Sequence, residues 1–200
     1  GWAQTTFTLT SPTNNAFVKR STTFSYNITG ATEQVTVKLT ATGPGSFRTT
    51  VERKDDPNTD GKISGSLALS LSQSAPEGRY TVELTATEEG KTYPKITRTI
   101  TVDGTAPKFL DFNPAGSVYV KGNVRITANL DEPNTEEWRV QVGGADIPNN
   151  TGTSKRVDVL WDTAPIEGDG QQTVTIIAKD RAGNEGKKDI TVVIDRVRPS

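Results

Sequence analysis

Two segments decide the fold of this 200-residue chain, Gly78–Ala86 (GRYTVELTA) and Thr99–Pro107 (TITVDGTAP). Both recur 92 residues later, as Gly170–Ala178 (GQQTVTIIA) and Thr191–Pro199 (TVVIDRVRP). A match at one fixed spacing indicates a repeated structural unit. The sequence therefore predicts two copies of one fold.

Earlier segments extend the repeat toward the start of each copy. Pro12 and Phe17–Ile28 match Pro114 and Tyr119–Leu130, now at a spacing of 102 residues. The second copy is therefore about ten residues shorter in its middle. We place the copies at residues 1–104 and 105–200, each close to the size at which a single hydrophobic core is self-sufficient.

Within each copy, apolar residues alternate with polar ones, which is typical of half-buried β-strands. In the first copy this pattern predicts seven strands, around Phe7–Leu9, Phe24–Ile28, Val35–Leu39, Phe47–Val51, Leu67–Leu71, Tyr80–Ala86 and Ile96–Val102. The second copy repeats it around Phe109–Phe112, Val124–Leu130, Trp138–Val142, Val157–Trp161, Val174–Ala178 and Ile190–Ile194, with the fourth strand poorly defined. The expected fold class is all-β, with two tandem antiparallel β-sandwiches.

Three motifs give this pattern a family likeness. Tyr80 precedes Val82 by two residues, as a corner tyrosine precedes the usual cysteine of an immunoglobulin strand, although the second copy has Gln172 at the tyrosine position. Trp138 lies on a third strand, where the family places its core tryptophan, and Ala178–Asn184 resembles a closing hairpin. The chain thus resembles tandem immunoglobulin-like domains of bacterial secreted and cell-surface proteins, which implies a fold and an extracellular setting.

Composition excludes several classes of function. The chain has no cysteine, histidine or methionine, and 23 basic side chains balance 24 acidic ones. It therefore lacks an imidazole base, a thiolate nucleophile and zinc–thiolate ligands, and it has no basic surface for nucleic acid. No apolar run reaches the roughly 20 residues that membrane insertion requires. Any metal would be a hard cation held by oxygen atoms.

The segment Asp56–Ile63 (DPNTDGKI) has the spacing of a calcium loop. Asp56, Asn58 and Asp60 would supply side-chain oxygens, and Lys62 its carbonyl. The twelfth position, normally a bidentate glutamate, is Leu67, so helix–loop–helix geometry is excluded. The alternative is a polar turn in which Asp-Pro and Asp-Gly serve the backbone geometry alone.

A second calcium hypothesis follows from the family likeness. In such folds the last strand of one domain ends near the next domain's loops after its second and sixth strands, which implies a cluster of Asp103, Asp131, Glu132 and Asp180. Carboxylates held close together repel one another unless a cation lies among them. The alternative is that these charges are solvated and screened.

Aromatic side chains raise the question of glycan binding. Trp161, Tyr93 and Tyr119 could form a flat platform on which a sugar stacks, whereas Trp138 is explained by the core. Trp161 ends an alternating strand, so the core is the favoured place for it as well.

The expected function is a non-catalytic spacer, stalk or adhesive module of an extracellular or cell-surface protein, stiffened by calcium. Its partners would be neighbouring domains of a longer chain, and a cell-surface protein or glycan. The alternative is a carbohydrate- or protein-binding accessory module of a secreted hydrolase. An enzyme would need two or more buried carboxylates with raised pKa in one pocket.

Overall fold

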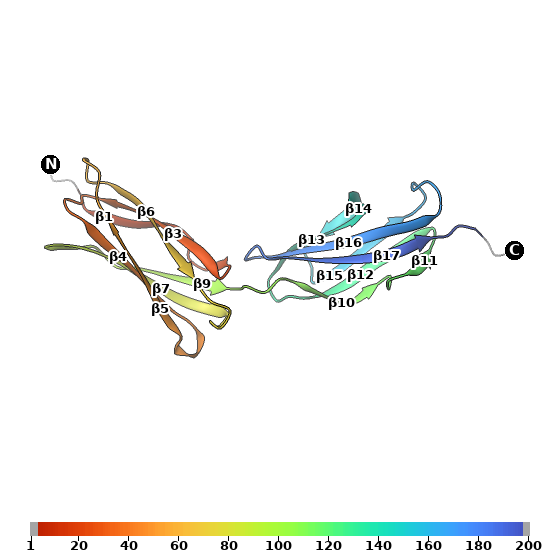
Figure 1. Cartoon of the computed structure of the whole chain (residues 1–200), viewed down its shortest axis with the longest axis horizontal. Coiled ribbons are helices and arrows are strands. Elements are labelled where there is room, and N and C mark those ends of the chain that lie inside the picture. Colours follow the sequence, from red (N-terminus) through yellow and green to blue (C-terminus); the bar gives the residue numbers. More distant parts are fainter. Residues whose placement is uncertain (1–3, 198–200) are drawn as a thin grey trace. The chain divides into compact units, whose positions relative to one another are not determined.

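The computed structural model describes residues 4–197 and divides the chain into two compact units, Gly1–Gly104 and Thr105–Ser200. Each unit is a sandwich of two β-sheets, which Figure 1 shows with the strand labels used below. The predicted fold class, all-β with two tandem sandwiches, is confirmed.

Within its described residues, the first unit has nine strands and one short 3-10 turn, η1 (Pro44–Ser46). The strands are β1 (Thr6–Ser11), β2 (Ala16–Val18), β3 (Ser21–Thr29), β4 (Val35–Thr42), β5 (Arg48–Asp55), β6 (Ile63–Ser70), β7 (Gly78–Glu88), β8 (Lys91–Thr92) and β9 (Ile96–Val102). One sheet has the order β1-β3-β6 and the other β2-β9-β7-β4-β5, with β8 paired to β7.

The second unit, as far as the structure describes it, repeats this plan with eight strands. They are β10 (Lys108–Asn113), β11 (Val118–Val120), β12 (Asn123–Asp131), β13 (Thr135–Val142), β14 (Ala145–Gly152), β15 (Arg156–Asp162), β16 (Gly170–Asp180) and β17 (Glu185–Ile194). Its sheets have the orders β10-β12-β15 and β11-β17-β16-β13-β14.

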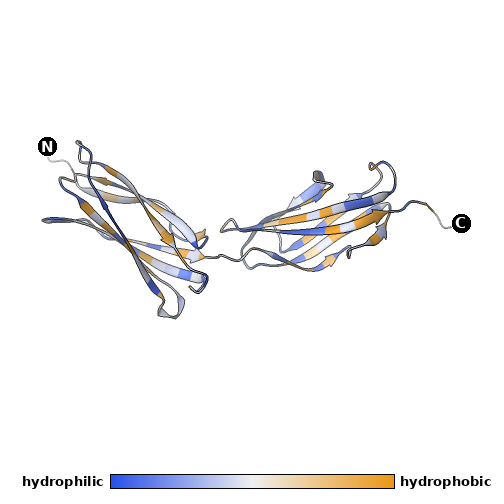
Figure 2. Cartoon of the chain, in the orientation of Figure 1, coloured by the Kyte–Doolittle hydropathy of each residue, from blue (hydrophilic) through white to orange (hydrophobic). Residues whose placement is uncertain are grey.

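The alternation along the strands produces two separate cores, as Figure 2 shows by the orange residues that recur along the ribbons. The predicted corner is confirmed, because the Tyr80 hydroxyl donates to the Pro76 carbonyl at 2.6 Å. Val82 and Val174, at the position of the family's cysteine, are fully buried. Trp138 is 6% exposed, as its core assignment predicts. Apolar packing therefore holds the sheets together without a disulfide.

The chain enters each sandwich at one end and leaves it at the opposite end. In the first unit β2 runs parallel to β9, and in the second unit β11 runs parallel to β17. The second and the last strand of each unit, in chain order, therefore point the same way. A pull on the two ends of a unit slides these paired strands past one another instead of peeling them apart.

The poorly defined fourth strand of the second copy is β14, which arches away from its partner. Four residues, Ile147 to Asn150, lie opposite Val140 alone, and Asn149 has a φ of 53°. The Asn150 side-chain amide donates to the Val140 carbonyl at 3.0 Å and so replaces a backbone donor. With this bulge and Pro148 in the strand, no alternating pattern can form.

Candidate functional site

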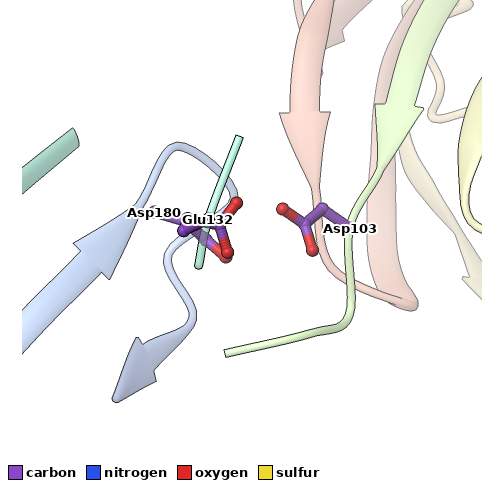
Figure 3. Close-up of side chains that lie close together, drawn as sticks. All are labelled: Asp103, Glu132 and Asp180. Atoms are coloured by element: carbon purple, nitrogen blue, oxygen red, sulfur yellow. The ribbon is translucent and has the colours of Figure 1, made fainter. Parts of the chain in front are cut away.

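Two buried carboxylates meet at one end of the second unit. Glu132 directly follows β12 and Asp180 ends β16, and they are 4% and 0% exposed. Their carboxylate oxygens lie within 4.8 Å of each other, and Figure 3 shows the two side chains next to each other. The fold thus brings Glu132 and Asp180 together at this end of the unit.

Backbone turns hold the two carboxylates in place. The Asn134 amide donates to Glu132 Oε1 at 3.0 Å. The β16–β17 turn wraps around Asp180, whose two oxygens accept from the Asn184 backbone and side-chain amides, each at 2.9 Å. These donors orient the two carboxylates.

The donor set fits a hard cation. Two carboxylates at this separation repel each other, and the repulsion is stronger where little water screens it. Calcium takes six to eight oxygen ligands, and Glu132 and Asp180 offer up to four between them. Nitrogen or sulfur ligands of the kind that zinc selects do not occur in the sequence.

Strand alternation explains which acidic residues meet. Leu130 faces the core, so Asp131 points outward and Glu132 inward. Asp131 is exposed and lies opposite Lys108 in the sheet, away from the pair. The same alternation through Ala178 directs Asp180 inward. If the alternation is continued past the end of the strand, the sequence alone predicts that Asp131 points outward and Glu132 inward.

Asp103 lies in the first unit, immediately after β9, where its backbone amide donates to the Val18 carbonyl at 2.9 Å. Its expected place in a shared site with Asp131, Glu132 and Asp180 stays a prediction. Sequence reasoning missed Asn134 and Asn184, whose amides orient the acidic pair; the signal was a short polar turn after each strand.

The proposed loop at residues 56–62 is a hydrogen-bonded turn. The Asn58 amide donates to the Lys62 carbonyl at 2.9 Å, and the Lys62 amide donates to Asp60 Oδ1 at 3.2 Å. Asp56 Oδ1 accepts instead from the Gln34 side chain at 3.2 Å. These contacts account for the turn residues without an ion, and the calcium assignment of Asp56, Asn58, Asp60 and Lys62 stays a prediction.

Most of the aromatic candidates cannot stack on a sugar. Trp161 and Tyr93 are 2% and 3% exposed, and Trp138 is buried as well. Tyr119 alone among the four is open to solvent, at 74%. A sugar platform needs aromatic faces side by side at the surface, so these residues do not form one.

The second unit also has a cavity of about 520 Å³ between the β13–β14 hairpin and the end of β15. Its walls are largely apolar and include Ile147, Leu160 and Ile166, and two carboxylates, Asp146 and Asp162, lie in its lining. Both are exposed to solvent. The cavity therefore does not hold a buried pair of carboxylates.

Several solved structures are similar to this chain. The fibronectin(III)-like modules of Clostridium thermocellum CbhA match with a TM-score of 0.51 and 14% identity over 97% of both chains. Chicken CNTN1 FN1-FN3 domains match with a TM-score of 0.48 and 11% identity, over 92% of this chain and 64% of that one. A tetra-tandem repeat from the extending region of a large adhesion protein matches with a TM-score of 0.37 and 20% identity, over 96% and 50%.

No protein-family model matches the sequence, and neither does any curated protein. The likeness to the CbhA modules shows the fold: two tandem sandwiches of the immunoglobulin and fibronectin(III) kind. Within residues 4–197, no helix is long and apolar enough to span a membrane. The fold alone does not identify the function of the chain.

Proposed function

We propose that the chain is a non-catalytic spacer of a bacterial secreted or cell-surface protein, in which each sandwich transmits load from one neighbouring domain to the next. The observation that carries this proposal is the parallel pairing of the second and last strands in both units, β2 with β9 and β11 with β17. Chain ends at opposite poles let sandwiches follow one another along a chain. The short segment Gly104–Pro107, with its proline, joins the two units and limits flexing between them.

The backbone bonds at the chain exits support this role. In the first unit the Asp103 amide donates to the Val18 carbonyl at 2.9 Å, and in the second the Asp195 amide donates to Val120 at 3.0 Å. Near the other end of each pair, Asn15 and Ser117 donate to threonine carbonyls at 2.6 and 2.7 Å. A stretching force on a unit must break these bonds together, which resists unfolding more than breaking them one by one.

Force spectroscopy on the whole chain, held by its ends, tests the proposal. We expect two separate unfolding events, each releasing about 330 Å of chain when fully extended. Gradual lengthening at low force, without discrete events, would contradict a load-bearing role.

The same proposal includes calcium at Glu132 and Asp180, where a divalent cation would relieve the repulsion between the buried carboxylates. Calcium bound only to the folded state raises stability by about 2.7 kcal/mol at a concentration one hundred times its Kd. We expect the melting temperature to rise with calcium and to fall back with a chelator. Glu132→Gln and Asp180→Asn should abolish the rise.

Three further variants show which acidic residues are responsible for any rise in melting temperature with calcium. Asp131→Asn is the matched control, because this residue is exposed and points away from the pair. Asp60→Ala tests the turn of the first unit, and Asp103→Asn tests whether that residue joins the ion. A melting temperature that excess calcium leaves unchanged in the unmodified chain removes the metal from the proposal and leaves the spacer role standing.

A further inference from the structure

One sheet of the first unit contains no charged residue. Its strands β1, β3 and β6 read TFTLTS, STTFSYNIT and ISGSLALS, in a chain that is 24% charged overall. The matching sheet of the second unit, β10-β12-β15, carries seven charged residues: Lys108, Asp111, Arg125, Asp131, Arg156, Asp158 and Asp162. The two copies share a fold but differ in the number of charged residues on this sheet.

Charges matter most on the edge strands of a sheet, where unpaired backbone groups can bind another strand. Natural sheets protect their edges with charged residues, prolines and bulges. β10 has two charges, and at Asp111 the chain adopts a φ of 49° beside a break in the strand register. Its counterpart β1 has neither a charge nor a proline, although it too has a register shift, near Thr10.

The other edge of the uncharged sheet is guarded by a neighbouring strand. Arg53 of β5 extends to β6 and donates from Nη1 to the Ser66 carbonyl at 3.0 Å. On β1, in contrast, the described residues pair only with β3. The outward edge of β1 therefore keeps its own backbone donors and acceptors for another strand.

β1 has the side chains that strand pairing favours. Phe7 and Leu9 are buried at 7% and 8% and fix which face of the strand meets the core. Thr6, Thr8 and Thr10 occupy the opposite face, and the last two are exposed. Threonine pairs across antiparallel strands are stabilising, and no like charges stand in the way.

We propose that β1 pairs antiparallel with β1 of a second copy of this chain, which joins two three-stranded sheets into one of six. A two-fold axis relates the copies, so one uncharged strand serves both sides of the contact. Residues directly opposite in a sheet point to the same face, so Phe7 must meet a core-facing residue of the second copy. The register with the largest overlap places Phe7 opposite Leu9 and Thr8 opposite itself.

The contact is weak when copies are dilute. A pair of six-residue strands buries well below the roughly 1,200 Å² of a stable interface. Pairing then depends on copies being held side by side at high local concentration, where several contacts act together. A spacer with this edge would associate laterally with its own kind, a property separate from load transmission.

Disulfide trapping tests the register directly, because the chain contains no cysteine. Thr8→Cys places one thiol at the proposed two-fold axis, within the Cα separation that a disulfide spans. We expect the oxidised dimer to form at least about tenfold faster than with Leu110→Cys, the exposed position on β10, or Thr23→Cys, on the outer face of the same sheet. Equal rates for the three variants overturn the proposal, as does faster trapping at Thr23.

A charge substitution provides the second test. Thr8→Lys brings two like charges face to face in the proposed dimer, whereas Thr23→Lys adds the same charge to the central strand. Sedimentation equilibrium at high concentration should show that the first variant weakens dimerisation about tenfold or more and the second leaves it nearly unchanged. Circular dichroism checks that both fold. Equal dimerisation in both variants, or a monomeric unmodified chain at millimolar concentration, overturns the proposal.

Discussion

At the residue scale, the two units use an arginine for the same purpose from different places in the chain. Arg20, between β2 and β3, donates from Nη1 to the Ser72 and Ala75 carbonyls at 2.7 and 2.9 Å. Arg196, beyond the end of β17, donates from Nη2 to the Thr163 and Ile166 carbonyls at 2.6 and 2.9 Å. Each guanidinium thereby holds the loop before the sixth long strand of its unit.

The repeat places a glycine where the other unit has its arginine. Gly122 corresponds to Arg20, and Gly104 corresponds to Arg196. A Cβ atom on Gly104 would lie 2.7 Å from Arg20 Nε, so the site accommodates one arginine at a time. The backbone amide at this position makes the same kind of bond in both units. The Gly104 amide donates to the Glu77 carboxylate at 2.8 Å, and the Arg196 amide donates to the Asp169 carboxylate at 3.1 Å.

This exchange predicts a rescue. Arg20→Gly should destabilise the first unit by about 1–3 kcal/mol, because it leaves two loop carbonyls without their donor. Adding Gly104→Arg should recover much of that loss by supplying the guanidinium from the position used in the second unit. Urea unfolding of the single and double variants measures the effect. A double variant less stable than both single variants would show that the two positions are not equivalent.

A second residue-scale prediction concerns Glu88, which is 7% exposed. Burial alone would raise its pKa, but hydrogen bonds from Tyr93, Lys91, and the Glu33 and Thr32 amides outweigh burial and lower the pKa from 4.5 to about 2. The stability that this carboxylate contributes is therefore complete above pH 4.5 and is lost as the pH falls toward 2.

Glu88→Gln should remove that part of the acid dependence and cost stability at neutral pH. Unfolding free energy measured between pH 2 and 7 tests this, with the exposed neighbour variant Glu89→Gln as the control. If Glu88→Gln and the unmodified chain lose stability in parallel over that range, the low pKa is contradicted.

At the element scale, alternation predicted the long strands because each buries one face. It missed β2, β8 and β11, which have two or three residues and are too short to show a period. It also left β14 undefined, since the Ile147–Asn150 arch interrupts pairing with β13. Sequence patterns thus located the strands that build the core. The short strands and β14 are defined by their pairing with strands elsewhere in the sheet, which the sequence pattern does not show.

A hydrogen bond between side chains far apart in the sequence also links the two sheets of the first unit. The Tyr26 hydroxyl of β3 donates to Asp55 Oδ2 of β5, and Arg53 donates to the other oxygen of Asp55 at 2.8 Å. Burial and the Asp55 carboxylate raise the pKa of Tyr26, so its hydroxyl keeps its proton. No spacing in the sequence pointed to this pair, because β3 and β5 lie in different sheets.

Tyr26→Phe should lower the unfolding free energy by about 0.5–2 kcal/mol, because it removes the donor to Asp55 and leaves the ring packing intact. Tyr119→Phe is the matched control, since that ring is 74% exposed. Guanidinium unfolding compares the two, and equal effects would mean that the Tyr26–Asp55 bond adds nothing to stability.

At the scale of the whole molecule, the repeat in the sequence predicted two sandwiches, and the family likeness predicted that loops after the second and sixth strands would bring acidic residues together. Glu132 and Asp180 do meet, whereas Asp131, one residue earlier, faces solvent. These neighbouring residues point in opposite directions because successive side chains along a strand alternate between its two faces. The uncharged sheet could be recognised only once the strands of both units were matched. Its lack of charge stands out by comparison with the seven charged residues on the matching strands of the second unit.

In the proposed spacer, the parallel pairing of β2 with β9 and of β11 with β17 makes each unit resist stretching. Asp195→Pro weakens this pairing in the second unit, because proline has no amide hydrogen to donate to Val120. The first unit of the same molecule serves as an internal control. With the chain pulled by its ends, we expect one of the two unfolding events to shift to lower force while the other is unchanged. Two events at the forces of the unmodified chain, with the second unit correctly folded, would contradict the proposed role.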